Sequence, residues 1–151
     1  MKSKKFKIAI VVSQFNKEIS DALLYGAKST VEKRAKKIVD IEIFKVPGAF
    51  EIPGIVNLLI KNDADLDGIL TLGSVIKGET AHFEYISESV VHSIANISIS
   101  SDIPIVFGVL TTYDYEQAFK RADVNQLNNG GEVMSTLLDM LAIYSQIKNK
   151  R

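Results

Sequence analysis

His82 stands where a helix is expected to begin, directly after a loop that contains glycine. In the stretch LGSVIKGETAHFEYI, an apolar run ends at Ile76 and a new amphipathic pattern starts at His82. The free N–H groups and positive dipole of a helix start favour a neutral imidazole, which can accept a proton beside a bound anion. Gly78 permits close approach of the backbone, and Thr80 can cap the helix or bind an anion. The alternative is a histidine that only covers the helix start.

Three further segments combine residue types that suit a flat, phosphorylated ligand. Phe15 follows the first apolar run in a polar loop, as either a cover over the core or a stacking surface for a heterocycle. The segment PGAFEIP, 47–53, contains a turn, two apolar residues and a glutamate. A loop that only connects a strand to a helix would not need this combination. Arg121 is either part of a solvated helix face or a bidentate partner for phosphate. His92 has no such loop beside it, and we expect a packing or surface residue there.

Short β-branched runs alternate with helical periodicity along the chain, which is typical of a parallel sheet with crossover helices. The run at 67–76 is the most continuously apolar, so we expect it inside the sheet. The predicted strands are 6–12, 39–46, 67–76 and 103–111. The predicted helices are one that buries Ile19, Ala22, Leu23, Gly26 and Ala27, followed by 54–61, about 81–98, 115–122 and 131–148.

Two of these helices have apolar stripes that predict which side is buried. The apolar positions recur at spacings of three and four residues, as one face against a core requires. The predicted inner faces are Phe83, Ile86, Val90, Val91, Ile94 and Ile97 in one helix, and Met134, Leu137, Leu138, Leu141 and Ala142 in the last helix.

Right-handed crossovers convert this alternation into a doubly wound α/β sandwich of three layers. Such sheets bind ligands outside the carboxyl ends of their strands. We therefore expect the loops after the strands to meet at one edge of the sheet, and these loops are 13–16, 47–53, 74–80 and 111–123.

The composition suits one globular domain that spans residues 1–151. Basic and acidic residues each number 18, so no net field favours nucleic acid or an anionic membrane as a partner. No apolar run approaches the ~20 residues of a membrane span, and a strand explains the apolar start better than a secretory signal does. We expect a cytoplasmic protein whose basic ends, about 1–5 and 148–151, are mobile tails.

Missing motifs exclude several classes of enzyme. The chain has no cysteine, which removes thiolate metal sites and a cysteine nucleophile. It has no GxGxxG after the first strand, no P-loop and no GxSxG elbow, and neither histidine has a metal-ligand spacing. What remains is an enzyme that works by positioning and proton transfer, with no metal or organic cofactor.

The loops carry a series of motifs in a fixed order, namely SQFN, VPGAFEIP, LGSVIKGETAHFEYI, PIVFGVLTT, EQAFKRA and NNGGE. This series resembles the 6,7-dimethyl-8-ribityllumazine synthase family over about Phe6–Ile143. The resemblance implies a flavodoxin-like fold with a four-stranded parallel sheet. It also implies the penultimate step of riboflavin biosynthesis, in which a ribitylaminouracil and 3,4-dihydroxy-2-butanone 4-phosphate are joined with loss of phosphate and water.

The resemblance further implies roles for individual residues. His82 would move protons during imine formation and phosphate elimination, and Glu79 and Thr80 would hold the phosphate. Phe15 would stack on the pyrimidine. The groups that would hold the ring edge and the ribityl chain are Ala49, Phe50 and Glu51, and the backbone of Ser74, Val75 and Ile76.

An oligomer is implied as well, because Phe107 and Arg121 would come from a neighbouring subunit, with Arg121 reaching the phosphate. The family forms pentamers, alone or assembled into decamers or icosahedral shells of 60 subunits. Riboflavin synthase is a further partner that the resemblance implies.

Two positions depart from the family pattern. Gln14 stands where the family commonly has arginine, which should matter little beside the stacking ring of Phe15. Asn129 replaces the family's lysine and so removes a cation near the phosphate. Since charge-assisted hydrogen bonds are about twice as strong as neutral ones, we expect a weaker hold on the phosphorylated substrate unless Lys77 or Lys120 compensates.

The loss of that lysine also supports an alternative to the enzyme, a binding protein that holds riboflavin or a lumazine without turnover. A further alternative is a homologue that only forms a shell. The presence of His82 and Arg121 speaks against the binding protein, and the detailed pocket loops would have no purpose in a shell subunit.

Overall fold

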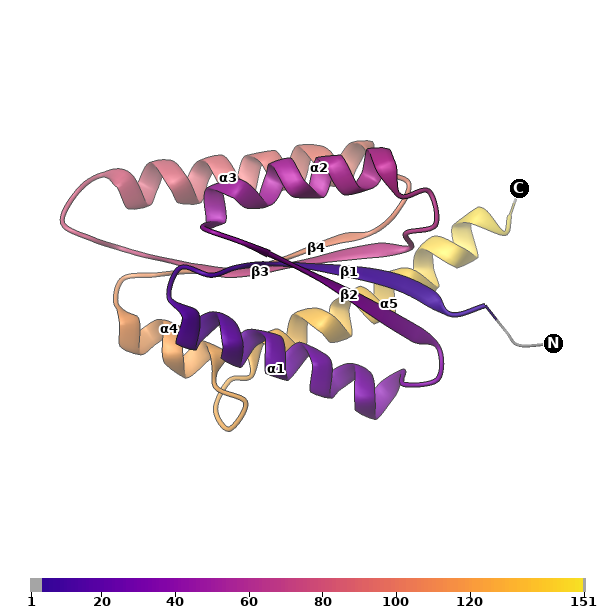
Figure 1. The fold of residues 1–151 in the computed structure, drawn as a ribbon, viewed down its shortest axis with the longest axis horizontal. Helices are drawn as coiled ribbons and strands as arrows, with labels where there is room; N and C mark the ends of the chain where they lie inside the picture. The colour runs from indigo at the N-terminus through magenta and orange to yellow at the C-terminus, as the bar shows by residue number, and fades with distance from the viewer. Residues whose placement is uncertain (1–3, 151) are drawn as a thin grey trace.

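Four parallel strands form a sheet that lies between two layers of helices (Figure 1). The structure, a computed structural model, describes residues 4–150, so the tail predictions for 1–3 and 151 fall outside the described residues. The strands are β1 (Phe6–Ser13), β2 (Val39–Val46), β3 (Gly68–Ile76) and β4 (Ile105–Thr112). The helices are α1 (Lys17–Arg34), the short 3-10 helix η1 (Ala49–Glu51), α2 (Ile52–Asn62), α3 (His82–Ser100), α4 (Tyr115–Ala122) and α5 (Asn129–Lys148). The predicted α/β three-layer sandwich is confirmed.

The strand order is β2-β1-β3-β4, which confirms that the most apolar run lies inside the sheet. β1 pairs with β3 as far as Val12 and Leu72, whereas β3 stays paired with β4 as far as Ile76 and Thr112. The last residues of β3, 74–76, therefore extend beyond the end of β1.

Each face of the sheet has its own hydrophobic core (Figure 1). α1, α4 and α5 cover one face, and α2 and α3 cover the other. A parallel sheet covered on both faces needs continuously apolar inner strands, and β1 and β3 have them. No helix within residues 4–150 combines the length and the apolar character needed to cross a membrane.

Two residues of the predicted inner faces point away from the core. Val91 is 40% exposed and Ala142 is exposed, although their neighbours Val90 and Leu141 are buried. Consecutive residues of a helix project about 100° apart, because one turn holds about 3.6 residues. Only one residue of each apolar pair can therefore face the sheet.

β2 and α4 have the predicted bounds, but other elements begin one or two residues away from their predicted starts, among them β4, α2 and α5. β4 begins at Ile105, two residues later than predicted, because Pro104 has no N–H to donate to the ladder. α2 begins at Ile52, two residues earlier than predicted. The N–H of Glu51 donates to the carbonyl of Gly48 at 3.2 Å, and the resulting 3-10 turn leads directly into α2.

α5 begins at Asn129, and an unusual backbone conformation fixes this start. Asn128 has φ 46°, in the left-handed region that asparagine tolerates, and its side chain accepts a hydrogen bond from the N–H of Gly131 at 3.3 Å. A β-carbon at Gly130 would overlap the carbonyl group of Leu23 in α1. The close α1–α5 contact therefore holds Asn129 in the layer opposite α2 and α3.

Candidate active site

The carboxyl ends of β1, β2 and β3 and the start of α3 surround a pocket of about 480 Å³. Residues from the loops 13–16, 47–53 and 74–80 line it, so three of the four predicted loops do meet at one edge of the sheet. The lining residues are Phe15, Gly48, Ala49, Phe50, Glu51, Ser74, Val75, Ile76, Gly78, Thr80, His82, Phe83 and Ile86.

Phe15 presents a free aromatic ring at this pocket. The residue is 71% exposed, so the interpretation of Phe15 as a cover over the core is wrong. Its N–H donates to the carbonyl of Pro47 at 3.0 Å, and the N–H of Gln14 donates to Val46 at 2.8 Å. Asn16 follows with φ 60° and turns the chain into α1. The backbone is thus fixed while the ring is left available for stacking.

The segment after β2 presents a second aromatic side chain. Ala49 is buried in the core on the α2/α3 side, whereas the neighbouring Phe50 is 61% exposed. The 3-10 turn is anchored through Ala49, and Phe50 and Glu51 are left at the pocket. The pocket therefore combines apolar surface with a carboxylate.

The end of β3 forms a wall of the pocket through Ser74, Val75 and Ile76. Among the described residues, this part of β3 has no strand partner on the side of β1. An open strand edge offers N–H and C=O groups that can pair with a ligand. Asn16 Nδ2 donates to Ser74 Oγ at 3.4 Å and ties the Phe15 loop to this wall.

The loop before α3 offers unpaired N–H groups. Within residues 4–150, no hydrogen bond uses the N–H groups of 78–81. α3 begins at His82, one residue after the predicted start, and the N–H of His82 reaches Thr80 Oγ1 at 3.4 Å, which is a long capping bond. Free N–H groups at the positive end of a helix of 19 residues suit an anion.

Two residues of this loop contribute less than expected within the chain. A β-carbon at Gly78 would meet no atom of the protein, so packing within the chain does not require glycine there. Glu79 is exposed and does not line the pocket. Its backbone N–H suits an anion, whereas its carboxylate would repel one.

Phe107 and Arg121 do not reach this pocket. Phe107 is half-buried on the edge strand β4, against the α2/α3 core. Arg121 is exposed on α4, in the opposite layer, and donates to the carbonyl of Gln117 at 3.2 Å. The expectation that segment 111–123 lines the same pocket is therefore wrong within one chain, and the role of both residues in a neighbouring subunit stays a prediction.

The pocket also contains residues that the sequence did not assign to it. Phe83 and Ile86 were expected only in the helical core, yet they line the pocket. Ile86 lies four residues after His82, and this spacing alone places both side chains on the same side of α3. Asn16 does not line the pocket itself but supports it, and no local signal predicts this role, because its contact with Ser74 joins residues 58 positions apart.

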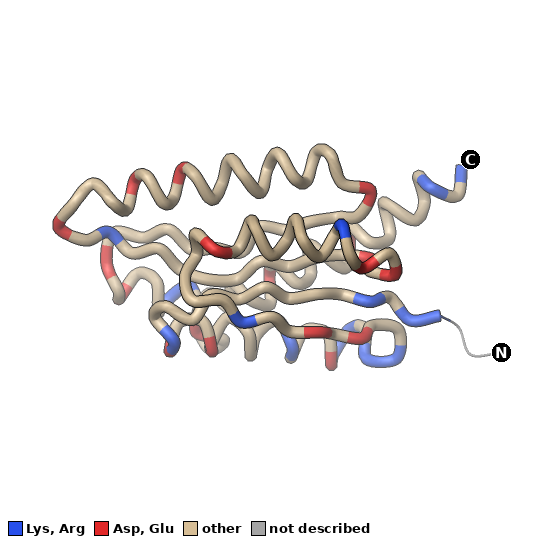
Figure 2. Tube along the Cα trace, turned by 45° about the horizontal axis from the view of Figure 1, so that its top comes forward, with Lys and Arg blue, Asp and Glu red and all other residues tan. Residues whose placement is uncertain are grey.

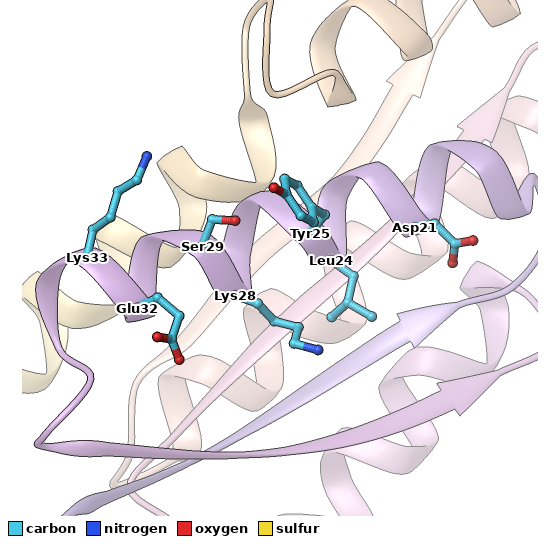
Figure 3. A pocket seen from close by; sticks show the side chains of 7 residues that line it. All are labelled: Asp21, Leu24, Tyr25, Lys28, Ser29, Glu32 and Lys33. Carbon is cyan, nitrogen blue, oxygen red and sulfur yellow. The ribbon is translucent and has the colours of Figure 1, made fainter.

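A larger hollow of about 560 Å³ lies along α1 (Figure 3). Its lining residues all come from this one helix and are Asp21, Leu24, Tyr25, Lys28, Ser29, Glu32 and Lys33. Figure 3 shows their side chains spread along the helix instead of converging on one point. Acidic and basic groups alternate there, as on a solvated helix face, so this hollow is not the candidate site.

The chemistry available in the 480 Å³ pocket is stacking, hydrogen bonding, anion binding and proton transfer. His82 is exposed at the pocket and can exchange protons with a ligand. Within residues 4–150, no group of three or more His, Cys, Asp or Glu side chains could hold a metal ion.

Comparison with known proteins assigns the family. A family model described as 6,7-dimethyl-8-ribityllumazine synthase matches residues 5–145. A protein of that name from Leuconostoc mesenteroides subsp. mesenteroides is 46% identical over 143 residues, which cover 95% of this chain and 91% of the relative. Proteins of the same name from Nautilia profundicola and Sulfurospirillum multivorans are 42% and 39% identical, over 93% and 95% of this chain and 91% of each relative. The chain therefore belongs to the 6,7-dimethyl-8-ribityllumazine synthase family.

Proposed function

We propose that this chain is a 6,7-dimethyl-8-ribityllumazine synthase, a transferase of riboflavin biosynthesis that works as one domain over residues 1–151. It condenses 5-amino-6-(D-ribitylamino)uracil with 3,4-dihydroxy-2-butanone 4-phosphate and releases phosphate and water. Family membership supports the reaction. The observation that carries the assignment of the site is the meeting of a free aromatic ring, an open strand edge and unpaired N–H groups around His82.

The flat substrate binds between Phe15 and the end of β3. The exposed ring of Phe15 stacks on the pyrimidine, and the backbone of 74–76 pairs with the polar edge of the ring. Ala49, Phe50 and Glu51 hold the other side of the ring and the ribityl chain. These contacts fix the amine of the substrate in one position.

The phosphate of the four-carbon substrate binds at the N–H groups of 78–81, with Glu79 contributing its backbone and Thr80 its hydroxyl group as well. The amine then attacks the ketone carbon, and His82 carries a proton to the oxygen that leaves as water. His82 next accepts a proton from carbon while the phosphate departs. The ribitylamino nitrogen then attacks the remaining ketone carbon, and loss of a second water closes the ring. Holding two substrates in reactive geometry supplies most of the rate, and proton transfer by His82 supplies the rest.

A neighbouring subunit completes the site. Phe107 lies on an edge strand and Arg121 on an exposed face of α4, so both can contact another copy of the chain. We infer a pentamer, with Arg121 on the phosphate of its neighbour, that assembles further into decamers or shells. Riboflavin synthase is the expected protein partner, and the cytoplasm is the expected location.

A turnover assay tests the function. Purified protein is mixed with both substrates, and the absorbance of the lumazine is followed with time. His82→Ala should lower kcat about 100-fold, and Arg121→Ala should raise KM for the phosphorylated substrate. His92→Ala is the matched control, because His92 is an exposed histidine of the same helix away from the pocket.

The outcomes separate the candidate functions. Unaltered turnover in His82→Ala would remove His82 from the reaction, and unaltered KM in Arg121→Ala would remove Arg121 from the phosphate. Wild-type protein that binds riboflavin or a lumazine but gives no turnover would instead be the non-catalytic binding protein, for which the substitution at Asn129 is the supporting feature.

A further inference from the structure

Lys77 directly precedes the 78–81 loop, which is the proposed phosphate site. Its neighbours Ile76 and Gly78 both line the pocket, whereas Lys77 itself does not. Its N–H donates to the carbonyl of Thr112 at 2.9 Å, so the first residue of the loop is held against the end of β4. The side chain is exposed, and within residues 4–150 no ion pair involves it.

An aromatic ring lies beside this lysine. Lys77 Nζ is 5.7 Å from the centroid of the Tyr113 ring, within the range of a cation–π interaction. The Tyr113 ring in turn lies 6.5 Å from the ring of Phe83, which lines the pocket. The N–H of Tyr113 donates to Gln117 Oε1 at 2.9 Å, so the first turn of α4 fixes its backbone. A continuous series of contacts thus connects the pocket wall to the lysine.

Within the described residues, the neighbouring helices α3 and α4 place no other cation next to the 78–81 loop. α3 carries Glu84 and Glu88 but no lysine or arginine, and its tube in Figure 2 has no blue segment. Lys120 and Arg121 lie on α4, in the layer on the other face of the sheet. Among the basic residues of the end of β3, α3 and α4, Lys77 is therefore the one that adjoins the 78–81 loop in the same chain.

We propose that Tyr113 holds the ammonium group of Lys77 beside the 78–81 loop, where Lys77 binds the phosphate of the four-carbon substrate. Lys77 then contributes in its own chain the positive charge that Asn129 does not provide. Tyr113 is a positioning residue, since it acts on the phosphate only through Lys77. This inference rests on the proposed function.

Kinetics with each substrate varied separately test the proposal. Lys77→Met should raise KM for the phosphorylated substrate about tenfold, the equivalent of one hydrogen bond to a charged group. KM for the ribitylaminouracil and kcat should stay within about twofold of wild type. Lys61→Met, which removes an exposed lysine at the end of α2, is the matched control and should change none of these values.

Two substitutions at Tyr113 test the positioning role. Tyr113→Leu should raise KM for the phosphorylated substrate by about twofold to fivefold, as loss of an exposed cation–π contact predicts. Tyr113→Phe keeps the ring face and should retain the wild-type value. Equal effects of the two substitutions would overturn the role of the ring, and an unchanged KM in Lys77→Met would overturn the proposal as a whole.

Binding of inorganic phosphate, measured by calorimetry, gives a readout that does not depend on turnover. Lys77→Met should weaken phosphate binding by a factor similar to its effect on KM, and Lys61→Met should not. Weakened phosphate binding in Lys77→Met combined with an inactive wild type would refute the proposed function and leave the anion site intact. Turnover in the wild type with unchanged phosphate binding in Lys77→Met would refute only the role of Lys77.

Discussion

At the amino end of the sheet, Lys7 pairs with acidic side chains, whereas at the carboxyl end several charged and polar groups around the pocket have no partner within residues 4–150. Lys7 lies near the start of β1, and its ammonium group is 2.6 Å from a carboxylate oxygen of Asp63 and 3.8 Å from one of Glu42. The N–H of Lys7 donates to the side chain of Asp67 at 2.7 Å. The groups at this end satisfy each other within the chain.

The carboxyl end differs in each respect. Phe15 and Phe50 expose most of their surface, and the N–H groups of 78–81 have no partner among the described residues. The ion pairs within residues 4–150 include neither Lys77 nor Glu51. Polar and charged groups usually have partners within their own chain, except at functional sites. The difference therefore identifies the carboxyl end of the sheet as the functional end, called the working end below. Substitutions at one end should change activity, and those at the other should change stability.

After His82→Ala, the largest expected effect at the carboxyl end is that of Phe15→Ala. Loss of one stacking face should raise KM for the ribitylaminouracil about tenfold or more. The melting temperature should stay at the wild-type value, because the ring is 71% exposed and supports no core. A melting temperature of Phe15→Ala several degrees below wild type, with unchanged KM, would mean that Phe15 stabilises the fold and does not bind the substrate.

The next largest effect is expected for Asn129→Lys, which restores a cation at the start of α5. We expect KM for the phosphorylated substrate to fall by about twofold to fivefold, since a charge-assisted hydrogen bond replaces a neutral one. Asn125→Lys adds the same charge in the exposed loop after α4 and is the control. An unchanged KM in Asn129→Lys, with normal turnover, would show that Asn129 is not near the phosphate of any subunit.

At the amino end, Lys7→Met should lower stability and leave the kinetic constants unchanged. A fall in melting temperature of a few degrees at neutral pH is expected, because the Lys7–Asp63 pair is partly shielded from water. Lys5→Met removes the lysine of the more exposed pair with Asp40 and should have a smaller effect. A loss of turnover in Lys7→Met would contradict the separation of the two ends.

The pH dependence of stability checks the same pair. The hydrogen bond from Lys7 holds the pKa of Asp63 below its usual value, so its contribution is present above about pH 4 and is lost as pH falls through the lowered pKa. The hydrogen bond to Asp63 raises the pKa of Lys7, so its contribution is present below about pH 10 and is lost as pH rises through the raised pKa. Lys7→Met should remove the alkaline dependence and weaken the acidic one, which the hydrogen bond from the N–H of Asp65 to Asp63 also supports, and melting curves across the pH range would detect both changes.

The sequence predicted the elements and most of the pocket because both depend on local patterns. Hydrophobic periodicity placed β2 and α4 at their observed bounds, and the loops after three strands lie at one edge because parallel strands all point the same way. The extension of β3 beyond β1 depends on strand register, which no local pattern specifies. The layer that holds α4 likewise depends on packing, so the sequence wrongly brought segment 111–123 to the pocket of its own chain, whereas the role of Arg121 in a neighbouring subunit stays a prediction.

Lys77 and Tyr113 show the same limit at the level of a single contact. Each residue follows a strand in the sequence, one after β3 and the other after β4. Only the β3–β4 pairing, which ends at Ile76 and Thr112, brings the two side chains together. The sequence alone could name Lys77 as one possible substitute for the missing lysine but could not say what holds its side chain.

The smallest expected effect is that of Tyr115→Phe. It removes a hydrogen bond that lies near the carboxyl end but joins two helices instead of facing the pocket. The hydroxyl group of Tyr115 donates to a carboxylate oxygen of Glu18 at 2.5 Å and joins α4 to α1 near the carboxyl end, away from the pocket. This bond to Glu18 raises the pKa of Tyr115, so its contribution to stability is present below about pH 10 and is lost as pH rises through the raised pKa. Tyr115→Phe should lower the melting temperature slightly at neutral pH and leave KM and kcat unchanged. A changed KM would mean that the working end reaches α4 within one chain and is wider than the 480 Å³ pocket.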